Sequence, residues 1–224
     1  RGDCLSHLGV ARELGIVSGE AVQRKPLKSF KESGSTASEI KIHIDAPDAC
    51  LRYAARIIKD VKVGPSPKWL IDRLNSIGLS SINNIVDAAN YVLMDSGHPM
   101  HTFDLNQISG NEVKVRYAKK GETFKTLDEE KRKLSDFHLL ICDVEKPIAL
   151  AGIMGGINSE ITEKTTAILL ESAYFNPTVI RKGAKSLDLS TEASRRFERD
   201  TDIEGVIPAV DQLAQLILEV AGGI

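Results

Sequence analysis

The segment from Ile82 to Asp104, INNIVDAANYVLMDSGHPMHTFD, constrains the fold more than any other part of the chain. Its apolar residues recur every three or four positions, which predicts a helix with one buried face. These apolar positions are Ile85, Val86, Ala89, Val92 and Leu93. Asn83, Asn84 and Asn90 lie close to the same face, where an amide without a hydrogen-bond partner is costly. The mixture is typical of an assembled site rather than of a surface loop.

The turn after this helix contains two histidines. Because Pro99 has a fixed φ, we expect the chain to turn there and return His101 to the side of the helix. His101 is then either a hydrogen-bonded residue at the rim of the core or part of a site. His98 and His101 are three apart, but Pro99 prevents helical alignment and no carboxylate or cysteine clusters with them, so we expect no metal here.

Length and composition favour a globular protein with a sizeable core. The chain has 224 residues, of which 42% are hydrophobic and 27% charged, enough for one large domain or two joined modules. No apolar run of about 18 residues and no charged-then-apolar leader is present, so we expect neither a membrane span nor a secretory signal. The first residue is Arg1 rather than Met, and we expect the chain to be part of a longer polypeptide.

The charge balance argues against a module that mainly neutralises a nucleic-acid backbone, although a local basic patch is compatible with it. The formal net charge is −2 and the sequence pI is about 6.3. Cys4, Cys50 and Cys142 are odd in number, far apart and outside any CxxC pair. We therefore expect buried thiols rather than disulfides or structural zinc, and a cytoplasmic location.

The chain divides into four parts by composition. Residues 1–17 are expected to form a helix from a preceding domain, with Asp3 as its cap, and residues 18–38 a polar linker. The domain body is expected at 39–200. Residues 201–224 are expected to form a C-terminal helix leading to the next module.

Alternating and continuous apolar runs define the elements of the body. Ser66 is expected to cap a helix, with Pro67 in its first turn and with Trp69 or Leu70, Leu74 and Ile77 packed inward. Strands are predicted at 40–44, 53–63, 113–117, 123–127, 139–142, 148–151 and 167–170, and further helices at 176–187 and 203–220. The predicted fold class is α+β, with helices packed on mainly antiparallel sheets.

Three glycines fall within residues 152–156, GIMGG, between two buried strands. Their spacing matches neither GxGxxG nor a P-loop. They can form a tight turn, or they can let the backbone approach a small substrate or an oxyanion without an intervening side chain. The two interpretations have equal support.

Glu171 follows the apolar run 168–170, so it is expected at the end of a strand among buried residues. A buried carboxylate needs a partner. That partner is either a neighbouring arginine, Arg181 or Arg195, or a hydroxyl or amine of a substrate. Downstream, residues 191–199 are predicted to begin a helix capped by Ser190 or Thr191, and its arginines either face solvent or meet phosphates.

Five motifs in this chain resemble one known family. They are INN-x-VD-x-x-NYV at 82–92, HPMH-x-FD at 98–104, ALAGIMGG at 149–156, LLESA-x-F at 169–175 and TEASRRFERD at 191–200. In this order they are similar to the B3/B4 editing region of bacterial-type phenylalanyl-tRNA synthetase beta subunits. The opening RGDCLSHLGVARELG is similar to the segment that precedes this region in the family.

The resemblance implies hydrolysis of Tyr-tRNA(Phe), the product of mistaking tyrosine for phenylalanine. A hydrophobic pocket rejects an added hydroxyl weakly, so a second site that binds the hydroxyl is needed. By motif position, Glu171 is implied to accept a hydrogen bond from the tyrosyl hydroxyl, and Asn90 and His101 to hold substrate or water as the catalytic pair. The pocket is implied to be bounded by Gly152 and Gly155 and by the small residues Thr191 and Ala193.

The same resemblance implies the setting of the site. An aminoacyl ester is already activated, so a positioned water suffices and no protein nucleophile is required. No metal or cofactor is implied for this region, whereas the whole synthetase uses ATP and magnesium, binds tRNA(Phe) and joins an alpha subunit in an α2β2 heterotetramer. Ala89 departs from the family, where many relatives carry Thr. Two alternatives are a non-catalytic structural or interaction module and a free-standing deacylase.

Overall fold

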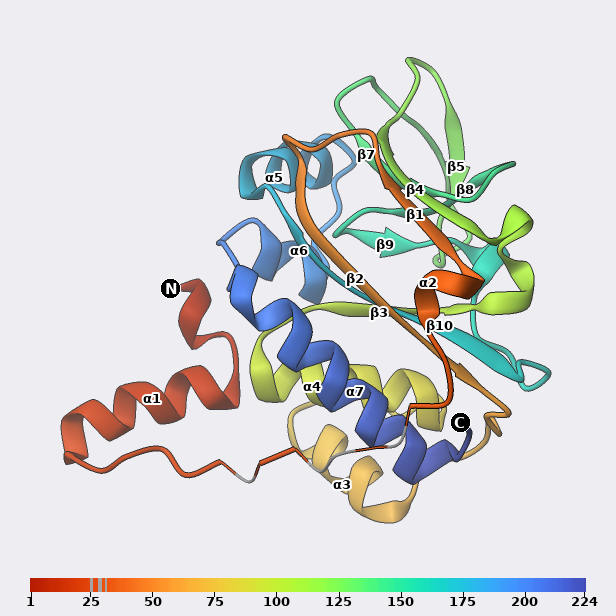
Figure 1. Ribbon diagram of the computed structural model, residues 1–224. Helices are drawn as coiled ribbons and strands as arrows, with labels where there is room; N and C mark the ends of the chain where they lie inside the picture. Colours follow the sequence, from red (N-terminus) through yellow and green to blue (C-terminus); the bar gives the residue numbers. More distant parts are fainter. Residues whose placement is uncertain (25, 28–29, 31) are drawn as a thin grey trace.

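Strand β10 (Ala167–Phe175) lies at the centre of the computed structural model, which describes residues 1–24, 26–27, 30 and 32–224. It pairs antiparallel with β2 (Cys50–Lys59) on one side and with β3 (Met100–Asp104) on the other (Figure 1). The expected strand end at Leu170 is wrong. Both neighbouring strands continue to pair with β10 beyond that point, so Glu171 lies in the middle of a strand.

One face of this three-stranded sheet is covered by the helices α4 (Asn84–Ser96) and α7 (Val206–Ala221), as Figure 1 shows. Ile168 and Leu170 point to that side because alternate residues of a strand share a face. Their apolar surface is removed from water by buried residues of both helices, which stabilises the packing by about 25 cal/mol per Å². These helix residues are Ile85, Ala88, Val92, Val210, Leu213, Ala214, Ile217 and Ala221.

The opposite face packs against a five-stranded sheet. Its strands are β1 (Lys41–Ile44), β4 (Glu112–Tyr117), β7 (Leu139–Cys142), β8 (Pro147–Leu150) and β9 (Met154–Gly155), in that order. Only β1 and β4 pair in parallel among the described strands. A separate hairpin is formed by β5 (Thr123–Lys125) and β6 (Lys131–Lys133). The predicted α+β class with mainly antiparallel sheets is confirmed.

The remaining helices surround the sheets. They are α1 (His7–Ser18), α2 (Thr36–Glu39), α3 (Lys68–Ser76), α5 (Pro177–Ser186) and α6 (Glu192–Phe197). Short 3-10 turns occupy Gly2–Cys4, Leu105–Gln107, Ser109–Asn111, Ile157–Ser159 and Ile203–Gly205. In the described part of the chain, no helix combines the length and apolarity that crossing a bilayer requires.

The asparagines before and within α4 hold its start in place. Asn83 is the N-cap, and its side chain accepts hydrogen bonds from the backbone of Ile85 and Val86. Asn84 is buried, accepts from the Gly64 amide and donates to the carbonyls of Lys62 and Val220. These two asparagines are therefore satisfied structural residues.

Several predicted caps and boundaries are wrong. Ser6, not Asp3, caps α1, because its hydroxyl accepts from the Gly9 amide. Pro67 is the N-cap of α3, and its ring has no polar atom that could accept a capping hydrogen bond. Ser66 does not cap the helix, because its hydroxyl donates to the buried carboxylate of Asp87.

Within α3 and β2 the corrections follow from exposure and backbone geometry. Trp69 is 38% exposed and Ile77 is 40% exposed, so α3 packs inward through Leu70 and Leu74. Strand β2 begins at Cys50 rather than at residue 53, and it ends at Lys59 because the next residue has a positive φ of 56°. The predicted helix at 203–220 starts as the 3-10 turn and continues as α7. The predicted linker at 18–38 ends in α2, and its residues 25, 28, 29 and 31 lie outside the described part.

Candidate functional site

Three polar side chains share the face of the central sheet that looks toward the five-stranded sheet. The pairing register places Glu171 on β10 directly opposite His101 on β3. On the other side, Tyr53 of β2 lies opposite Ala173, one same-face step from Glu171. The rest of this face is apolar core. Backbone pairing therefore brings together residues that are far apart in sequence.

Glu171 is 5% exposed, and its Oε2 atom has no hydrogen-bond partner among the described residues. Burial disfavours the carboxylate and raises the pKa of Glu171 to about 8. The Tyr53 hydroxyl lies close to this carboxyl and opposes the shift as a donor, although their geometry falls short of a full hydrogen bond and the hydroxyl has no other partner among the described residues. The proposed arginine partners are wrong: Arg181 is exposed, and Arg195 pairs with Glu192.

His101 has the same character. Its Nε2 atom is buried without a partner, and burial lowers the pKa of His101 to about 4, so the ring is neutral at pH 7. The ring packs edge-on to Phe103 with their centroids 4.5 Å apart. A neutral imidazole can accept a hydrogen bond at its unprotonated nitrogen, which suits a water or a hydroxyl better than an anion.

The backbone of the glycine loop turns at Gly152 and comes close to the His101 ring at Gly155. Gly152 has a φ of 66°, and an added Cβ would lie 3.0 Å from atoms of Phe175 and Ile180. At Gly155, an added Cβ would lie 2.5 Å from Cε1 of His101. The amides of Ile153 and Gly156 already donate to carbonyls of β8, so neither is free to bind an oxyanion.

A hollow of about 60 Å³ lies between His101, Glu171 and the glycine loop. This space corresponds to about two water molecules at roughly 30 Å³ each, so a larger ligand requires the walls to move. The lining residues are Pro99, Met100, His101, Ile141, Ala149, Leu150, Gly152, Ile153, Met154, Gly155, Glu171, Ala193 and Phe197. Five of the seven predicted site residues are thus brought together.

The other two predicted site residues lie outside the lining. Asn90 is half-buried on α4. Thr191 caps α6, and its hydroxyl donates to the Ile153 carbonyl over 2.8 Å while accepting from the Ser194 amide. Thr191 therefore fastens the glycine loop to α6, the helix that presents Ala193 to the hollow.

Tyr53 is the polar group that the sequence did not reveal as part of this face. The alternation of Tyr53, Ala55 and Ile57 within β2 could have indicated a shared inward face. Nothing in the sequence shows that β2 pairs with β10 rather than with another strand. The register that sets Tyr53 beside Glu171 is a tertiary property.

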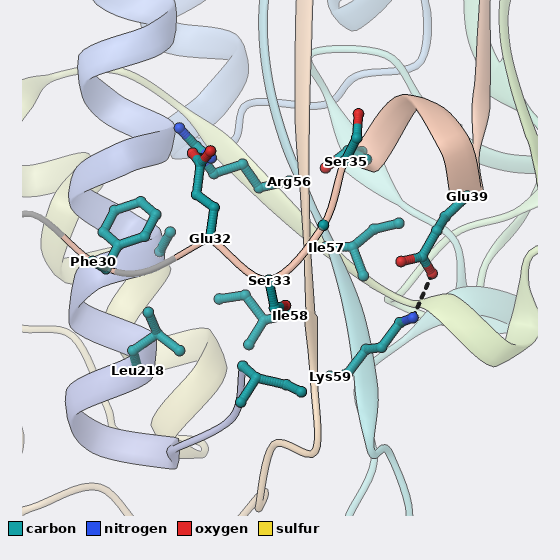
Figure 2. Close-up of a pocket in the computed structure, with 14 residues that line it drawn as sticks. Phe30, Glu32, Ser33, Ser35, Glu39, Arg56, Ile57, Ile58, Lys59 and Leu218 are labelled. Atoms are coloured by element: carbon teal, nitrogen blue, oxygen red, sulfur yellow. Dashed lines mark hydrogen bonds and ion pairs between the residues drawn. The ribbon is translucent and has the colours of Figure 1, made fainter.

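A larger hollow lies elsewhere in the described part of the molecule. It measures about 500 Å³ and is bounded by β2, α7 and the segment around Phe30 and Ser35 (Figure 2). Its cations are already paired: Lys59 lies 2.6 Å from Glu39, and Arg56 binds both Glu32 and Asp211. No buried polar atom without a partner faces this space among the described residues, which disfavours it as the reactive site.

One cluster in the described residues has metal-ligand spacing. It consists of Asp3, Cys4 and Glu13, whose ligand atoms lie within 4.8 Å of one another. The guanidinium of Arg1 pairs with both carboxylates of this cluster, so a cation is already supplied by the chain. His98 and His101 do not belong to it.

Comparison with known proteins identifies the family. The sequence profile described as the B3/4 domain matches residues 49–222. The phenylalanine–tRNA ligase beta subunit of Protochlamydia amoebophila is 51% identical over 224 residues, and that of Geobacter metallireducens 50% identical over 225. Each alignment covers 100% of this chain and 28% of the relative, so the chain spans little more than a quarter of these proteins.

A solved structure supports the fold. An N-terminal fragment of the phenylalanyl-tRNA synthetase beta subunit from Pyrococcus horikoshii superimposes with a TM-score of 0.57 over 98% of this chain and 58% of that chain, at 16% sequence identity. At this identity the likeness concerns the fold alone. Together with the profile and the close relatives, it leads to one conclusion: the chain belongs to the B3/4 domain family, as found in phenylalanine–tRNA ligase beta subunits.

Proposed function

We propose that this domain hydrolyses the tyrosyl ester of Tyr-tRNA(Phe) and thereby edits mischarged tRNA. The observation that carries the proposal is the buried Glu171, which has no ionic partner among the residues that the structure describes and lies opposite His101 at a glycine-walled hollow. A buried polar atom left unpaired costs about 1–3 kcal/mol. A ligand hydroxyl that supplies the missing hydrogen bond would recover this cost.

The discrimination rests on that hydroxyl. Tyrosine can donate its phenolic proton to the Glu171 carboxyl, whereas phenylalanine leaves the carboxyl unpaired. A site designed around a hydroxyl can reject the analogue lacking it by about 10⁴-fold or more. Because the hollow is narrow, entry of the aromatic ring requires the glycine loop or α6 to move outward, and the domain is expected to be more open when it binds substrate.

The chemistry needs no protein nucleophile. The oxygen of a bound water attacks the ester carbonyl carbon, the bond to the ribose oxygen breaks, and the proton released by the water goes to that leaving oxygen or to solvent. Neutral His101 can hold the water by accepting a hydrogen bond at Nε2. With a pKa of about 4 it is a weak base, so we assign it a role in positioning.

The complete protein has a wider proposed role. By analogy with the relatives, we propose that the intact beta subunit joins an alpha subunit, binds tRNA(Phe) and contributes to its charging with phenylalanine, using ATP and magnesium, in the cytoplasm. The aminoacylation site would lie outside this chain.

The test is Glu171→Ala in the intact ligase. We expect the rate of Tyr-tRNA(Phe) deacylation to fall by a factor of 10² or more, since the hydroxyl loses its acceptor. Glu163→Ala, at an exposed carboxylate on the loop before β10, is the matched control and should leave the rate unchanged. An unaltered deacylation rate in Glu171→Ala would contradict the proposal and favour a non-catalytic module.

A further inference from the structure

The outer face of the β5–β6 hairpin carries a lysine pattern that folding stability does not explain. Lys125 and Lys131 lie directly opposite each other across the two strands, and Lys133 follows on the same face. All three are exposed, while Phe124 and Arg132 occupy the inner face. Like charges placed opposite each other destabilise a strand pair. The pattern therefore points to a role in binding an anion.

These lysines are largely without counter-charges. Lys131 and Lys133 form no ion pair with any residue in the described ranges, and Lys125 reaches only the exposed Glu129, 3.8 Å away. The nearby carboxylate of Asp128 is occupied by Arg132 on the inner face. Surface pairs such as Lys125–Glu129 contribute little free energy, so the cation remains available. Glu130, an exposed acidic residue of the hairpin loop, forms no ion pair with the described residues and is a further negative charge near these lysines.

The lysine face continues away from the loop. The Gly121 amide donates to the carbonyl of Leu134, which joins the turn before β5 to the end of β6. The Lys133 side chain extends toward this turn, with its Cε atom 3.8 Å from the position of a Cβ on Gly121. The exposed Lys119 and Lys120 stand in the same turn. The domain as a whole has a net charge of −2, so this is a local concentration of positive charge.

The hairpin loop touches the mouth of the hollow. Thr126 forms an isolated bridge with Gly156, and the Leu127 amide donates to the Gly155 carbonyl over 3.0 Å. Gly155 is the residue against which the His101 ring packs. Lys125 immediately precedes Thr126, and Lys131 lies across the strand pair from Lys125. Both lysines are therefore close to the backbone that borders the candidate site.

We propose that the outer face of the β5–β6 hairpin, formed by Lys125, Lys131 and Lys133, binds the phosphate backbone of the single-stranded RNA end whose aminoacyl ester enters the hollow. This inference rests on the proposed editing function. RNA is the partner that fits, because an ester carried on a flexible polyanion needs cations beside the mouth of the site to hold it there. The lysines position the substrate and take no part in bond cleavage.

The experiment uses the intact ligase with Lys125→Gln, Lys131→Gln and Lys133→Gln combined. For deacylation of Tyr-tRNA(Phe), KM is expected to rise about tenfold with kcat within about twofold of the parent. Binding of a short single-stranded RNA is expected to lose about two units from the slope of log affinity against log salt, since each phosphate contact on a single strand contributes about 0.7. The matched control replaces Lys62, Lys68 and Lys164, three exposed lysines outside the hairpin, by glutamine and should change neither quantity.

The outcomes separate the two proposals. A triple variant whose RNA affinity and salt slope equal those of the control overturns the lysine face. A parent ligase that binds the short RNA through these lysines yet leaves Tyr-tRNA(Phe) intact overturns the editing function and keeps the RNA surface. A variant that binds RNA normally but separates into subunits on a sizing column would assign the lysines to a protein contact and overturn the RNA proposal.

Discussion

The two faces of the central sheet differ in how they treat polar groups. On the side of α4 and α7, the polar Ser172 of β10 is fully buried and satisfied, because its hydroxyl donates to the Val206 carbonyl over 2.8 Å. On the side of the five-stranded sheet, Tyr53, His101 and Glu171 each keep a buried polar atom that finds no hydrogen-bond partner in the described part of the chain. We call the first the completed face, because its buried polar group is hydrogen-bonded. We call the second the unfilled face, because a ligand there can form hydrogen bonds that the protein leaves unmade.

The largest effect is expected on the completed face. Leu170 of β10 is fully buried against α4 and α7. Leu170→Ala should therefore lower the free energy of unfolding by about 2–5 kcal/mol. Urea unfolding of the chain measures this. Leu51→Ala, at a half-exposed leucine of β2, serves as the control and should change stability by less than about 0.5 kcal/mol. Equal losses in the two variants would break the distinction between the faces.

On the unfilled face, a methyl group should damage activity more than stability. Gly155→Ala places a Cβ 2.5 Å from the His101 ring, which has to move. Displacing a positioning group by about 1 Å can cost about 10²-fold in rate, and we expect a loss of that size in deacylation. Gly34→Ala, where an added Cβ meets nothing within 4 Å, is the control. Full activity in Gly155→Ala would show that the position of His101 does not matter.

A third test follows the titration of Glu171, on the unfilled face, through the pH dependence of stability. The folded-state pKa of Glu171 is raised from its usual 4.5 to about 8, so the folded state holds a proton that the unfolded state releases. The Glu171 contribution to the free energy of unfolding should therefore fall as pH rises between about 4.5 and 8. Glu171→Gln cannot ionise, so the free energy of unfolding of the parent minus that of the variant should fall over this range in denaturant titrations.

Two buried histidines also make stability depend on pH, at the acid end of the same range. Burial lowers the pKa values of His98 and His101 to about 4, so the unfolded state takes up protons that the folded state refuses. The histidine contribution should lower stability as pH drops from about 6.5 toward 4. In the parent, protonation of Glu171 offsets part of this loss down to about pH 4.5, so stability should fall more steeply toward acid in Glu171→Gln. If the difference between parent and Glu171→Gln stays constant above pH 4.5, Glu171 does not carry a raised pKa in the folded state.

The contrast between the faces also marks what the sequence can predict. The helix at 84–96, the glycine loop and the strand leading to Glu171 follow from apolar spacing and local turn chemistry. Strand β6, with the sequence KRK, has no apolar alternation and was missed. Its partner β5 was predicted two residues too long.

The sequence does not predict which strands pair with one another. Glu171 interrupts an apolar run, so the sequence indicated a strand end there, whereas the ladders to β2 and β3 carry the strand to Phe175. The parallel pairing of β1 with β4 is likewise set by tertiary contacts. For the site, the resemblance selected five residues that meet at the hollow, and the structure joins Thr191 to the same loop by a hydrogen bond. The functional roles of all seven residues, Asn90 included, stay predictions.

The smallest effect concerns Tyr53, whose hydroxyl lies near the Glu171 carboxyl on the same face of the sheet. Removing the hydroxyl takes away a neighbouring donor that favours the ionised carboxyl. Tyr53→Phe should therefore raise the pKa of Glu171 further, and the decline of the Glu171 contribution to stability should continue to a higher pH than in the parent. The carboxyl carbon-13 NMR shift of Glu171 reports this titration directly.

Other groups near Glu171 cannot imitate the result. His101 is neutral throughout this range, and burial together with the charge of Glu171 raises the pKa of Cys50 to about 12, so neither titrates with it. The five-stranded sheet and α6 contribute only apolar side chains and glycines to the hollow. Tyr117→Phe removes a hydroxyl that binds Asp48 instead and should leave the titration unchanged. If Tyr53→Phe titrates like Tyr117→Phe, the carboxyl is governed by burial alone, and the tyrosine belongs to the packed core.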